Sequence, residues 1–429
     1  MSLYRNTIIL AIASVLSYSC RTDPERVKEK IDWLEKNSIH IRSIDPLDTM
    51  FDDLEFLSRE LQGVELIGLG EATHGDGSTF LAKTRLIRFL HERMGYEVLA
   101  FEGGLLDCFE MEKSFSKGDS QDSAFGKGPF AVWSRSAQVN SLKGYISNRK
   151  KSSKPLLLSG FDFQPSGTLS SSDRTSLLVA FYKQHELEFD TSTYHSFFSL
   201  FRNSNRLTLT RIRKDSILQE KFFHDLDQLV WLADRYEEIA EEDRVLKQYI
   251  HNLRPLYTHL FRRSLNNSEP DIKSVINLRD SMMAINMIWL KEEYFPGKKI
   301  IIWGANTHIG YNRDQLKYPD EMKPMGSFLK ELYGKRYYSL SFTAFDGNMF
   351  SMQQGLRALP QASNKSIEYV WSQCQSQYSF LRTDVFADGP FPEIFPARLF
   401  GYLNQEAVWK HMTDGIFFIK TMEASKIIK

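Results

Sequence analysis

Four short apolar runs, each ending abruptly in glycine and polar residues, constrain the fold of this chain more than any other feature. They span residues 64–69, 96–101, 155–159 and 299–303. Short apolar runs bounded by turn residues are typical of buried strands. A helical pattern with Gly95 as its stop signal joins the first run to the second. Strands joined in this way run parallel. The sequence therefore predicts an α/β fold with a central, mostly parallel sheet flanked by helices.

The stretch 171–295 differs from the rest because it contains no apolar run of comparable quality. Its apolar residues recur at helical spacing, and Pro296 followed by glycine ends the pattern. We therefore expect a large helical lobe over residues 171–295, inserted into the α/β domain. Residues 337–345 and 415–420 are expected to add further strands, and residues 24–61 to form covering helices.

The first twenty residues are set apart as a predicted export signal. Arg5 supplies a basic start, residues 8–16 an apolar centre, and small residues lead to Cys20. The apolar centre is far shorter than the ~20 residues of a spanning helix. The pattern resembles a bacterial lipoprotein signal, in which Cys20 is lipidated, although ordinary cleavage is the alternative. We expect residues 1–20 to form this lipoprotein-type signal segment, with Cys20 kept as the first residue of the mature protein so that its lipid anchors the exported domain, residues 21–429, in the bacterial cell envelope.

Composition limits the partners. Lys plus Arg and Asp plus Glu are equal at 54 each, so no net field favours nucleic acid or an anionic membrane surface. We expect a small-molecule ligand and a monomer, with membrane contact only through the N-terminal lipid. Apart from Cys20, the chain has two cysteines, Cys108 and Cys374. They could form a disulfide in an oxidising compartment or remain as two buried thiols.

Polar residues gather where the four predicted strands end. They are Glu71 and His74, Glu102, Asp162, and Asn306 and His308. The carboxyl ends of parallel strands lie along one rim of a sheet, which is where ligands bind in open α/β folds. Two histidines and three carboxylates at this rim predict an acid–base site in one shared cleft.

Several familiar sites are excluded by their missing residues. Residues 68–73 nearly follow the GxGxxG dinucleotide fingerprint but lack its third glycine. Glu102 also lies further along than the usual ~20 residues. No GxSxG nucleophile elbow or HExxH zinc motif occurs. The sequence therefore disfavours a dinucleotide enzyme and a serine hydrolase of the usual α/β kind.

Five ordered blocks resemble those of the erythromycin esterase family. They are GEATHG (70–75), FEGG (101–104), GFDFQ (160–164), LRDSMMAINMIWL (278–290) and WGANTHIG (303–310). The resemblance implies a hydrolase of esters or lactones with an α/β core and a helical lobe. It implies that a histidine activates water without a covalent acyl-enzyme, a required metal or another cofactor. Macrolide antibiotics are then one candidate substrate among several.

Matching motif to motif, the resemblance implies His74 as the base, with Glu71 in the same block. It places Glu102 at the second strand end and His308 opposite. We expect a carboxylate to hold the tautomer of the base, and His308 with backbone amides near Gly304 to stabilise the oxyanion. Which carboxylate pairs with which ring is left open.

Other residues are expected to bind substrate. Lys83 occupies a position where the family usually has a basic residue, and Arg85 follows it; a solvated helix face is the alternative for both. Asp162 and Asn306 are further candidates from the strand ends. Arg279 and Asp280 are expected to pair with each other and fix the lobe.

One departure from the family concerns the substrate. One helical turn after Trp133, where the family tends to have an acidic residue, this chain has Ala137 and Gln138. Two other functions remain open on the sequence. Glu71, His74, Glu102 and His308 could ligate zinc or manganese in a metal hydrolase, and the same cleft could serve a non-enzymatic surface lipoprotein that binds a ligand.

Overall fold

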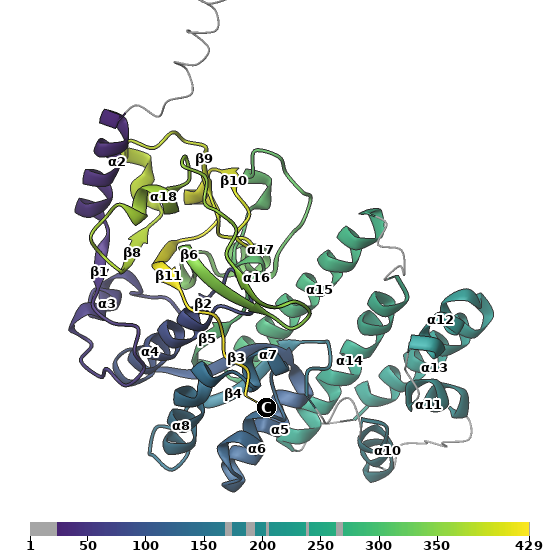
Figure 1. Ribbon diagram of the computed structural model, residues 1–429. Helices are drawn as coiled ribbons and strands as arrows, with labels where there is room; N and C mark the ends of the chain where they lie inside the picture. Colours follow the sequence, from purple (N-terminus) through teal and green to yellow (C-terminus); the bar gives the residue numbers. More distant parts are fainter. Residues whose placement is uncertain are drawn as a thin grey trace, which may run out of the picture.

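One large sheet organises the protein (Figure 1). The structure is a computed structural model that describes residues 24–167, 174–185, 194–202, 206–236, 240–262 and 269–428. Within these residues the sheet has nine strands, in the spatial order β1 (Ile39–Ile41), β8 (Tyr378–Arg382), β11 (Gly415–Met422), β6 (Tyr337–Ser351), β2 (Leu66–Leu69), β5 (Lys299–Trp303), β3 (Tyr96–Gly104) and β4 (Leu157–Asp162), with β7 (Gly355–Ala358) on the outer part of β6. A separate ladder pairs β9 (Phe395–Ala397) with β10 (Gln405–Ala407).

The sheet is mostly parallel, which confirms the predicted fold class. The six strands from β11 through β6, β2, β5 and β3 to β4 run parallel to their neighbours. Strands β1, β7 and β8 pair antiparallel at the margins. The sequence pattern did not predict β1, β7, β8, β9 or β10, because these short strands have no continuous apolar run.

The helices lie on both faces of the sheet and in a lobe to one side (Figure 1). Those outside the lobe are α2 (Pro24–Asn37), α3 (Leu57–Glu60), α4 (Gly77–Met94), α5 (Leu105–Lys117), α6 (Gln121–Phe125), α7 (Ala131–Ser134), α8 (Asn140–Arg149), α16 (Asn306–Ile309), α17 (Met325–Tyr333) and α18 (Ile367–Ser372). The lobe contains α10 (Arg174–Gln184), α11 (His195–Arg202), α12 (Arg206–Lys214), α13 (Ser216–Asp234), α14 (Glu241–Arg262) and α15 (Glu269–Trp289). A π-helical turn, Leu290–Tyr294, leads from α15 towards β5.

Strand alternation divides the apolar core between the two faces. In β5, Ile301 and Trp303 pack with α4 and α8, whereas Ile300 and Ile302 pack with α5 and the lobe. A continuous apolar run is therefore required, since both faces of each central strand are covered. Gly95 ends α4 in the left-handed conformation at φ 71°, as the stop signal predicted.

The order of the central strands differs from the simplest expectation. Strands β2 and β3 are joined by α4 and run parallel, yet they are not neighbours, because β5 lies between them. The strand that follows the lobe thus enters the middle of the sheet. Its carboxyl end comes to lie between those of β2 and β3.

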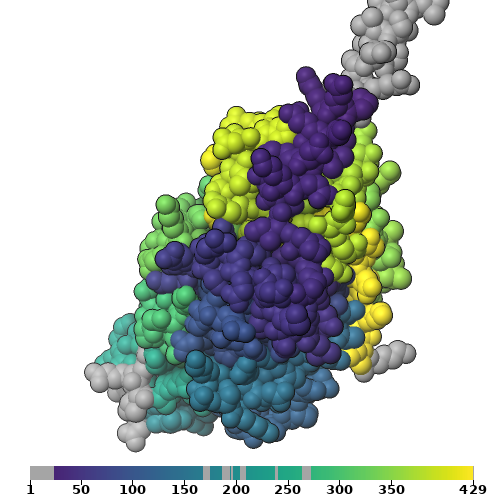
Figure 2. Space-filling view, turned by 90° about the vertical axis from the view of Figure 1, so that its left-hand side faces the viewer, coloured from purple at the N-terminus to yellow at the C-terminus, as the bar shows by residue number. Residues whose placement is uncertain are grey.

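Helix α2, the first described element, packs against the C-terminal third of the chain (Figure 2). Leu34 of α2 belongs to the same buried cluster as Trp371 of α18 and Phe418 of β11. Cys108 and Cys374 are both buried and free, so the disulfide alternative is wrong. In the part of the chain that is described, no helix has the length and hydrophobicity of a membrane span. The predicted signal segment and Cys20 lie outside the described residues.

Candidate active site

The register of the central strands brings the polar strand ends together. Leu69 of β2 and Phe101 of β3 both pair with Trp303 of β5. The pairing of β5 with both neighbours therefore ends at one level of the sheet, on the rim where ligands bind in parallel α/β folds. The polar residues just beyond this level are Glu71, Glu102, Asn306 and His308, of which Glu102 still belongs to β3.

The turn that carries His74 requires glycine on both sides. A Cβ on Gly70 would lie 1.9 Å from Oδ1 of Asn306, and one on Gly75 would lie 1.8 Å from the carbonyl oxygen of Phe350. Asn306 is fully buried, and its amide donates to two backbone carbonyls at 2.7 and 2.6 Å. These contacts fix the turn, so Asn306 has protein partners and its contact with substrate remains a prediction.

Glu71 fixes the orientation of the His74 ring. Its Oε1 lies 2.8 Å from Nδ1 of His74 and accepts a hydrogen bond from Nε1 of Trp133 at 3.0 Å. The Glu71 side chain is fully buried, whereas that of His74 is 45% exposed. Burial alone would lower the pKa of His74, but the hydrogen bond to Glu71 and the charge of Glu102 outweigh it and raise that pKa. With Nδ1 held in this way, Nε2 is the nitrogen left for chemistry.

Lys83 and Arg85 are both buried in α4, so the alternative of a solvated helix face is wrong. Nζ of Lys83 lies 2.7 Å from Oε2 of Glu71, and burial lowers the pKa of Lys83 although Glu71 opposes this. Arg85 forms a two-pronged pair with Asp53, at 2.9 and 2.7 Å. Lys83 thus supports the carboxylate that holds His74. Substrate binding by either residue remains a prediction.

Asp76 supports the same turn from the other side. It accepts hydrogen bonds from the backbone N–H of Thr73 at 2.9 Å and its hydroxyl at 2.5 Å, and from the hydroxyl of Tyr402 at 2.9 Å. Burial raises the pKa of Asp76 to about 7, although these hydrogen bonds oppose the rise. Tyr402 itself adopts a left-handed backbone at φ 58°, which is uncommon for a bulky residue.

Arg279 joins the second and third strand ends. From α15 it donates to Oε1 of Glu102 at 2.8 Å and to Oδ2 of Asp162 at 2.7 Å. The other oxygen of Glu102 accepts from the backbone N–H of Ala305 at 2.9 Å. Burial alone would raise the pKa of Glu102, but the charges of His308 and Arg279 hold it well below its ordinary value. Arg279 and Asp280 do not pair with each other as predicted; each contacts a different part of the strand-end cluster.

Asp280 holds His308. Its Oδ1 lies 2.7 Å from Nδ1 of His308, and Nε2 of His308 lies 3.3 Å from Oε1 of Glu102. Burial would lower the pKa of His308, but the charges of Asp280 and Glu102 outweigh it and raise that pKa to about 10. Nη1 of Arg279 lies 3.0 Å from the same Nε2. With His308 protonated, this is a contact between two cations that Glu102 bridges. The two carboxylates are thus divided: Glu71 serves His74, and Glu102 serves His308 and Arg279.

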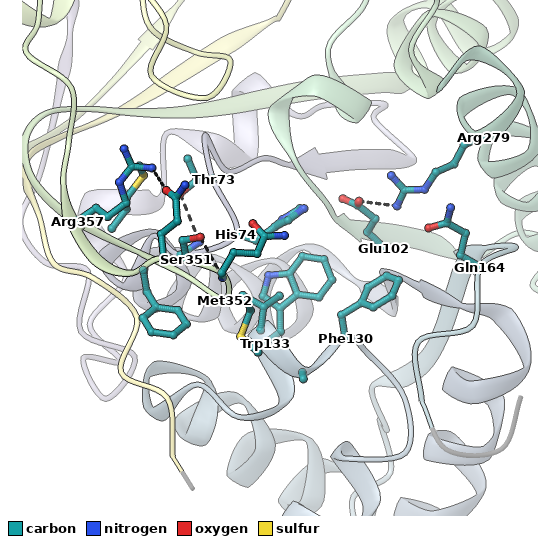
Figure 3. A pocket seen from close by; sticks show the side chains of 17 residues that line it. Thr73, His74, Glu102, Phe130, Trp133, Gln164, Arg279, Ser351, Met352 and Arg357 are labelled. Atoms are coloured by element: carbon teal, nitrogen blue, oxygen red, sulfur yellow. Dashed lines mark hydrogen bonds and ion pairs between the residues drawn. The ribbon is translucent and has the colours of Figure 1, made fainter. Parts of the chain in front are cut away.

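A pocket of about 660 Å³ opens beside His74 (Figure 3). Figure 3 shows the ring of His74 with the Glu102–Arg279 pair on one side and Thr73 and Arg357 on the other. The lining residues come from the strand ends, from residues 130–133 at α7, from Gln164 and Arg279, and from the hairpin of β6 and β7. Edge-on contact with Trp133, at 5.0 Å between ring centres, supports the His74 ring from below.

His308 does not line this pocket. It lines a neighbouring pocket of about 310 Å³ with Asp280, and Arg279 lines both pockets and lies between them. The expectation of one cleft shared by both histidines is therefore not met in this structure. The sequence analysis also missed the contribution of Arg279 and of the β6–β7 hairpin. The block LRDSMMAINMIWL contained a signal for Arg279, whereas the hairpin had none.

The polar cluster does not suit a metal ion. Among the described residues, no group of three or more His, Cys, Asp or Glu side chains is arranged to hold one. The oxygens of Glu71 face Lys83 and Trp133, and those of Glu102 face Arg279 and a backbone N–H. Donor groups therefore occupy the lone pairs that a metal would need.

The chain is similar in sequence to two known proteins and in fold to a solved structure. A Bacillus subtilis (strain 168) protein named "Putative hydrolase YbfO" is 27% identical over 98% of this chain and 97% of its own length. The Escherichia coli protein "Erythromycin esterase type II" is 20% identical over 92% of this chain and 99% of its own. A mutant of the erythromycin esterase EreC, solved in its open conformation, superposes with a TM-score of 0.67 at 18% identity, covering 90% of this chain and 98% of that one.

The family comparison covers most of the chain. The model of the erythromycin esterase family matches residues 91–419. The structural likeness at 18% identity shows a shared fold, and the family indicates a hydrolase of the ester type. On the strength of the family match, the chain belongs to the erythromycin esterase family.

Proposed function

We propose that the protein hydrolyses an ester or lactone with water that His74 activates. The observation that carries this proposal is the hydrogen bond of 2.8 Å between Nδ1 of His74 and the fully buried Glu71. It leaves Nε2 as the basic nitrogen beside a pocket of about 660 Å³. A carboxylate in this position holds the tautomer of the base and stabilises the imidazolium that forms.

The proposed reaction has two steps. Nε2 of His74 takes a proton from water while the water oxygen bonds to the ester carbon, giving a tetrahedral oxyanion. The intermediate then expels the alkoxide, which receives the proton from the imidazolium, so the products are a carboxylic acid and an alcohol. Because His74 must be neutral to act as a base, activity should rise as the pH passes its raised pKa.

Arg279 is the best-placed group for the oxyanion. Its Nε and Nη2 donate to Asp162 and Glu102, and its Nη1 lies beside His308. With His308 protonated, Nη1 has no acceptor among the described residues, so it can donate to a ligand in the pocket that Arg279 lines. His308 supports this arrangement through Glu102. Direct donation by His308 to the oxyanion, as expected from the sequence, requires a route past Arg279.

The test compares His74→Ala with wild-type protein on aryl esters, lactones and macrolides. Loss of the base should slow turnover by about 10²–10⁴ with much less effect on binding. His251→Ala is the matched control, because His251 also pairs with a carboxylate, Asp234 at 2.8 Å, but lies on α14 in the lobe. Equal activity of His74→Ala and wild type would refute the proposal.

Two other functions give different results in the same experiment. A metal hydrolase would contain about one metal ion per chain and would lose activity with a chelator. A ligand-binding lipoprotein would leave every ester and lactone intact while folded. Elemental analysis of the purified protein and a chelator titration distinguish the metal hydrolase from the proposed metal-free mechanism.

A further inference from the structure

The charges around the pocket of His74 are not balanced. Besides His74, the charged residues that line it are Glu102, Arg279 and Arg357. Glu102 and Arg279 form an ion pair at 2.8 Å, and Arg279 also pairs with Asp162. Among the described residues, the guanidinium of Arg357 contacts the side-chain oxygen of Gln354 and no other hydrogen-bond partner. No described carboxylate forms an ion pair with it, so the pocket has one uncompensated cation.

Arg357 has a defined place relative to His74. It lies on β7, paired with Met349 of β6 in the hairpin that projects past the sheet. The next residue of β6, Phe350, donates its backbone N–H to the carbonyl oxygen of Gly75 at 3.1 Å. The hairpin is thus hydrogen-bonded to the residue beside His74. Figure 3 shows Arg357 on the side of His74 that faces away from Glu102 and Arg279.

Part of the pocket wall is apolar. Phe130, Trp133, Met349, Phe350 and Met352 all line the pocket. Figure 3 shows Thr73 and Ser351 between His74 and Arg357, and Phe130 on the side of His74 towards Glu102. An ester at His74 could therefore rest its apolar part against the apolar lining and reach past Thr73 and Ser351 to Arg357. A guanidinium binds a carboxylate through two parallel hydrogen bonds and repels an amine of like charge. The chain as a whole has equal numbers of acidic and basic residues, so this preference would be local.

We infer that the site selects apolar esters or lactones that also carry a carboxylate, and that Arg357 recognises this group. The inference rests on the proposed function and names the substrate class of the same site. It places cationic substrates at a disadvantage. Because Arg357 is exposed to solvent, we expect a preference of about 5- to 20-fold for a carboxylate over a neutral analogue, decreasing with salt.

Binding tests the inference without any turnover. The probes are 4-phenylbutyrate, 4-phenylbutanamide and 4-phenylbutylamine, titrated into the purified protein by calorimetry at low and at high salt. The carboxylate should bind best and the amine worst. Arg357→Gln should remove the difference, and Arg357→Lys should keep part of it. Arg336→Gln is the matched control, because Arg336 precedes β6 at its opposite end and pairs with Glu65 at 3.5 Å. It should bind like wild type.

Three outcomes would overturn the inference: equal binding of the three probes, a preference that survives in Arg357→Gln, or no binding at millimolar concentration. Turnover of 4-nitrophenyl butyrate and of mono-4-nitrophenyl succinate separates this inference from the proposed function. If the carboxylate binds through Arg357 but neither of these esters, nor any lactone or macrolide of the panel above, is cleaved, the hydrolase proposal fails and the anion site stands. If both esters are cleaved at equal rates, and Arg357→Gln changes neither rate, the anion site fails and the hydrolase stands.

Discussion

Replacing Lys83 with methionine should destabilise the protein by about 3–5 kcal/mol, the usual cost of removing one partner from a buried ion pair. Nζ of Lys83 lies 2.7 Å from Oε2 of Glu71 and 3.3 Å from the carbonyl oxygen of Gly304, and both charged side chains are 0% exposed. Methionine nearly preserves the volume of the stem. The cost would therefore come from the Glu71 carboxylate, which loses its buried cation.

Urea unfolding followed by tryptophan fluorescence measures this cost, and a double-mutant cycle assigns it. Glu71→Gln combined with Lys83→Met removes both charges, so the double variant should be more stable than the sum of the two single losses predicts. Lys143→Met is the matched control. Lys143 is 3% exposed, but its partner Asp122 is 76% exposed, so water can solvate the carboxylate that remains. The reasoning is refuted if Lys83→Met costs no more than Lys143→Met, or if the two single losses simply add.

The same pair of substitutions should move the pH profile of hydrolysis in opposite directions. Glu71→Gln removes a hydrogen bond and a charge that raise the pKa of His74, so the rising limb of activity should move to lower pH. Lys83→Met removes the cation that offsets Glu71, and the limb should move to higher pH. A purely structural role for the pair would lower activity without moving the limb.

Two further predictions concern other parts of the chain. Because the pKa of Asp76 is raised to about 7, the folded protein holds its proton more tightly than the unfolded chain does, so this residue's contribution to stability should fall as pH rises from about 4 to 7. In Asp76→Asn that pH dependence should vanish. The free energy of unfolding of wild type and variant is measured at pH 5 and pH 8; an equal change between the two pH values in both proteins would contradict the prediction. Cys20→Ser should abolish detergent partitioning of the exported protein, because stable attachment requires two or more acyl chains. An intact mass showing unmodified Cys20 in the wild type would exclude the lipid anchor.

The sequence predicted those parts of the fold in which burial requires a recognisable local pattern of apolar residues. Strands covered on both faces must be continuously apolar, so β2, β3, β4 and β5 were found as runs. Marginal strands such as β7, whose residues are mostly exposed, have no such requirement. The spatial order of strands was not predictable, because nothing in β5 itself indicates that it inserts between β2 and β3.

For the candidate site, too, the sequence indicated residues that lie close together in the chain but not contacts between residues far apart in it. Glu71 and His74 lie three residues apart on one turn, so the sequence indicated both as a candidate acid–base pair, although it left open whether Glu71 or Glu102 holds the His74 ring. The partners of Arg279 and Asp280 are 177 and 28 residues away, and adjacent opposite charges wrongly suggested that the two residues pair with each other. Consecutive residues on a helix point in different directions, so Arg279 can face Glu102 while Asp280 faces His308.

The position of β5 explains why the site needs the whole chain. The two residues that follow β5 fix groups from the other strands. The carbonyl oxygen of Gly304 accepts a hydrogen bond from Lys83, and the N–H of Ala305 donates to Glu102; these contacts join residues 221 and 203 positions apart. The two carboxylates begin on β2 and β3, yet the segment after the lobe helps to fix both of them. Arg279, from the last helix of the lobe, then binds Glu102 from above the rim. Because the lobe supplies Arg279 and leads into β5, it completes the polar cluster at the strand ends, and this cluster cannot form from the first two strands alone.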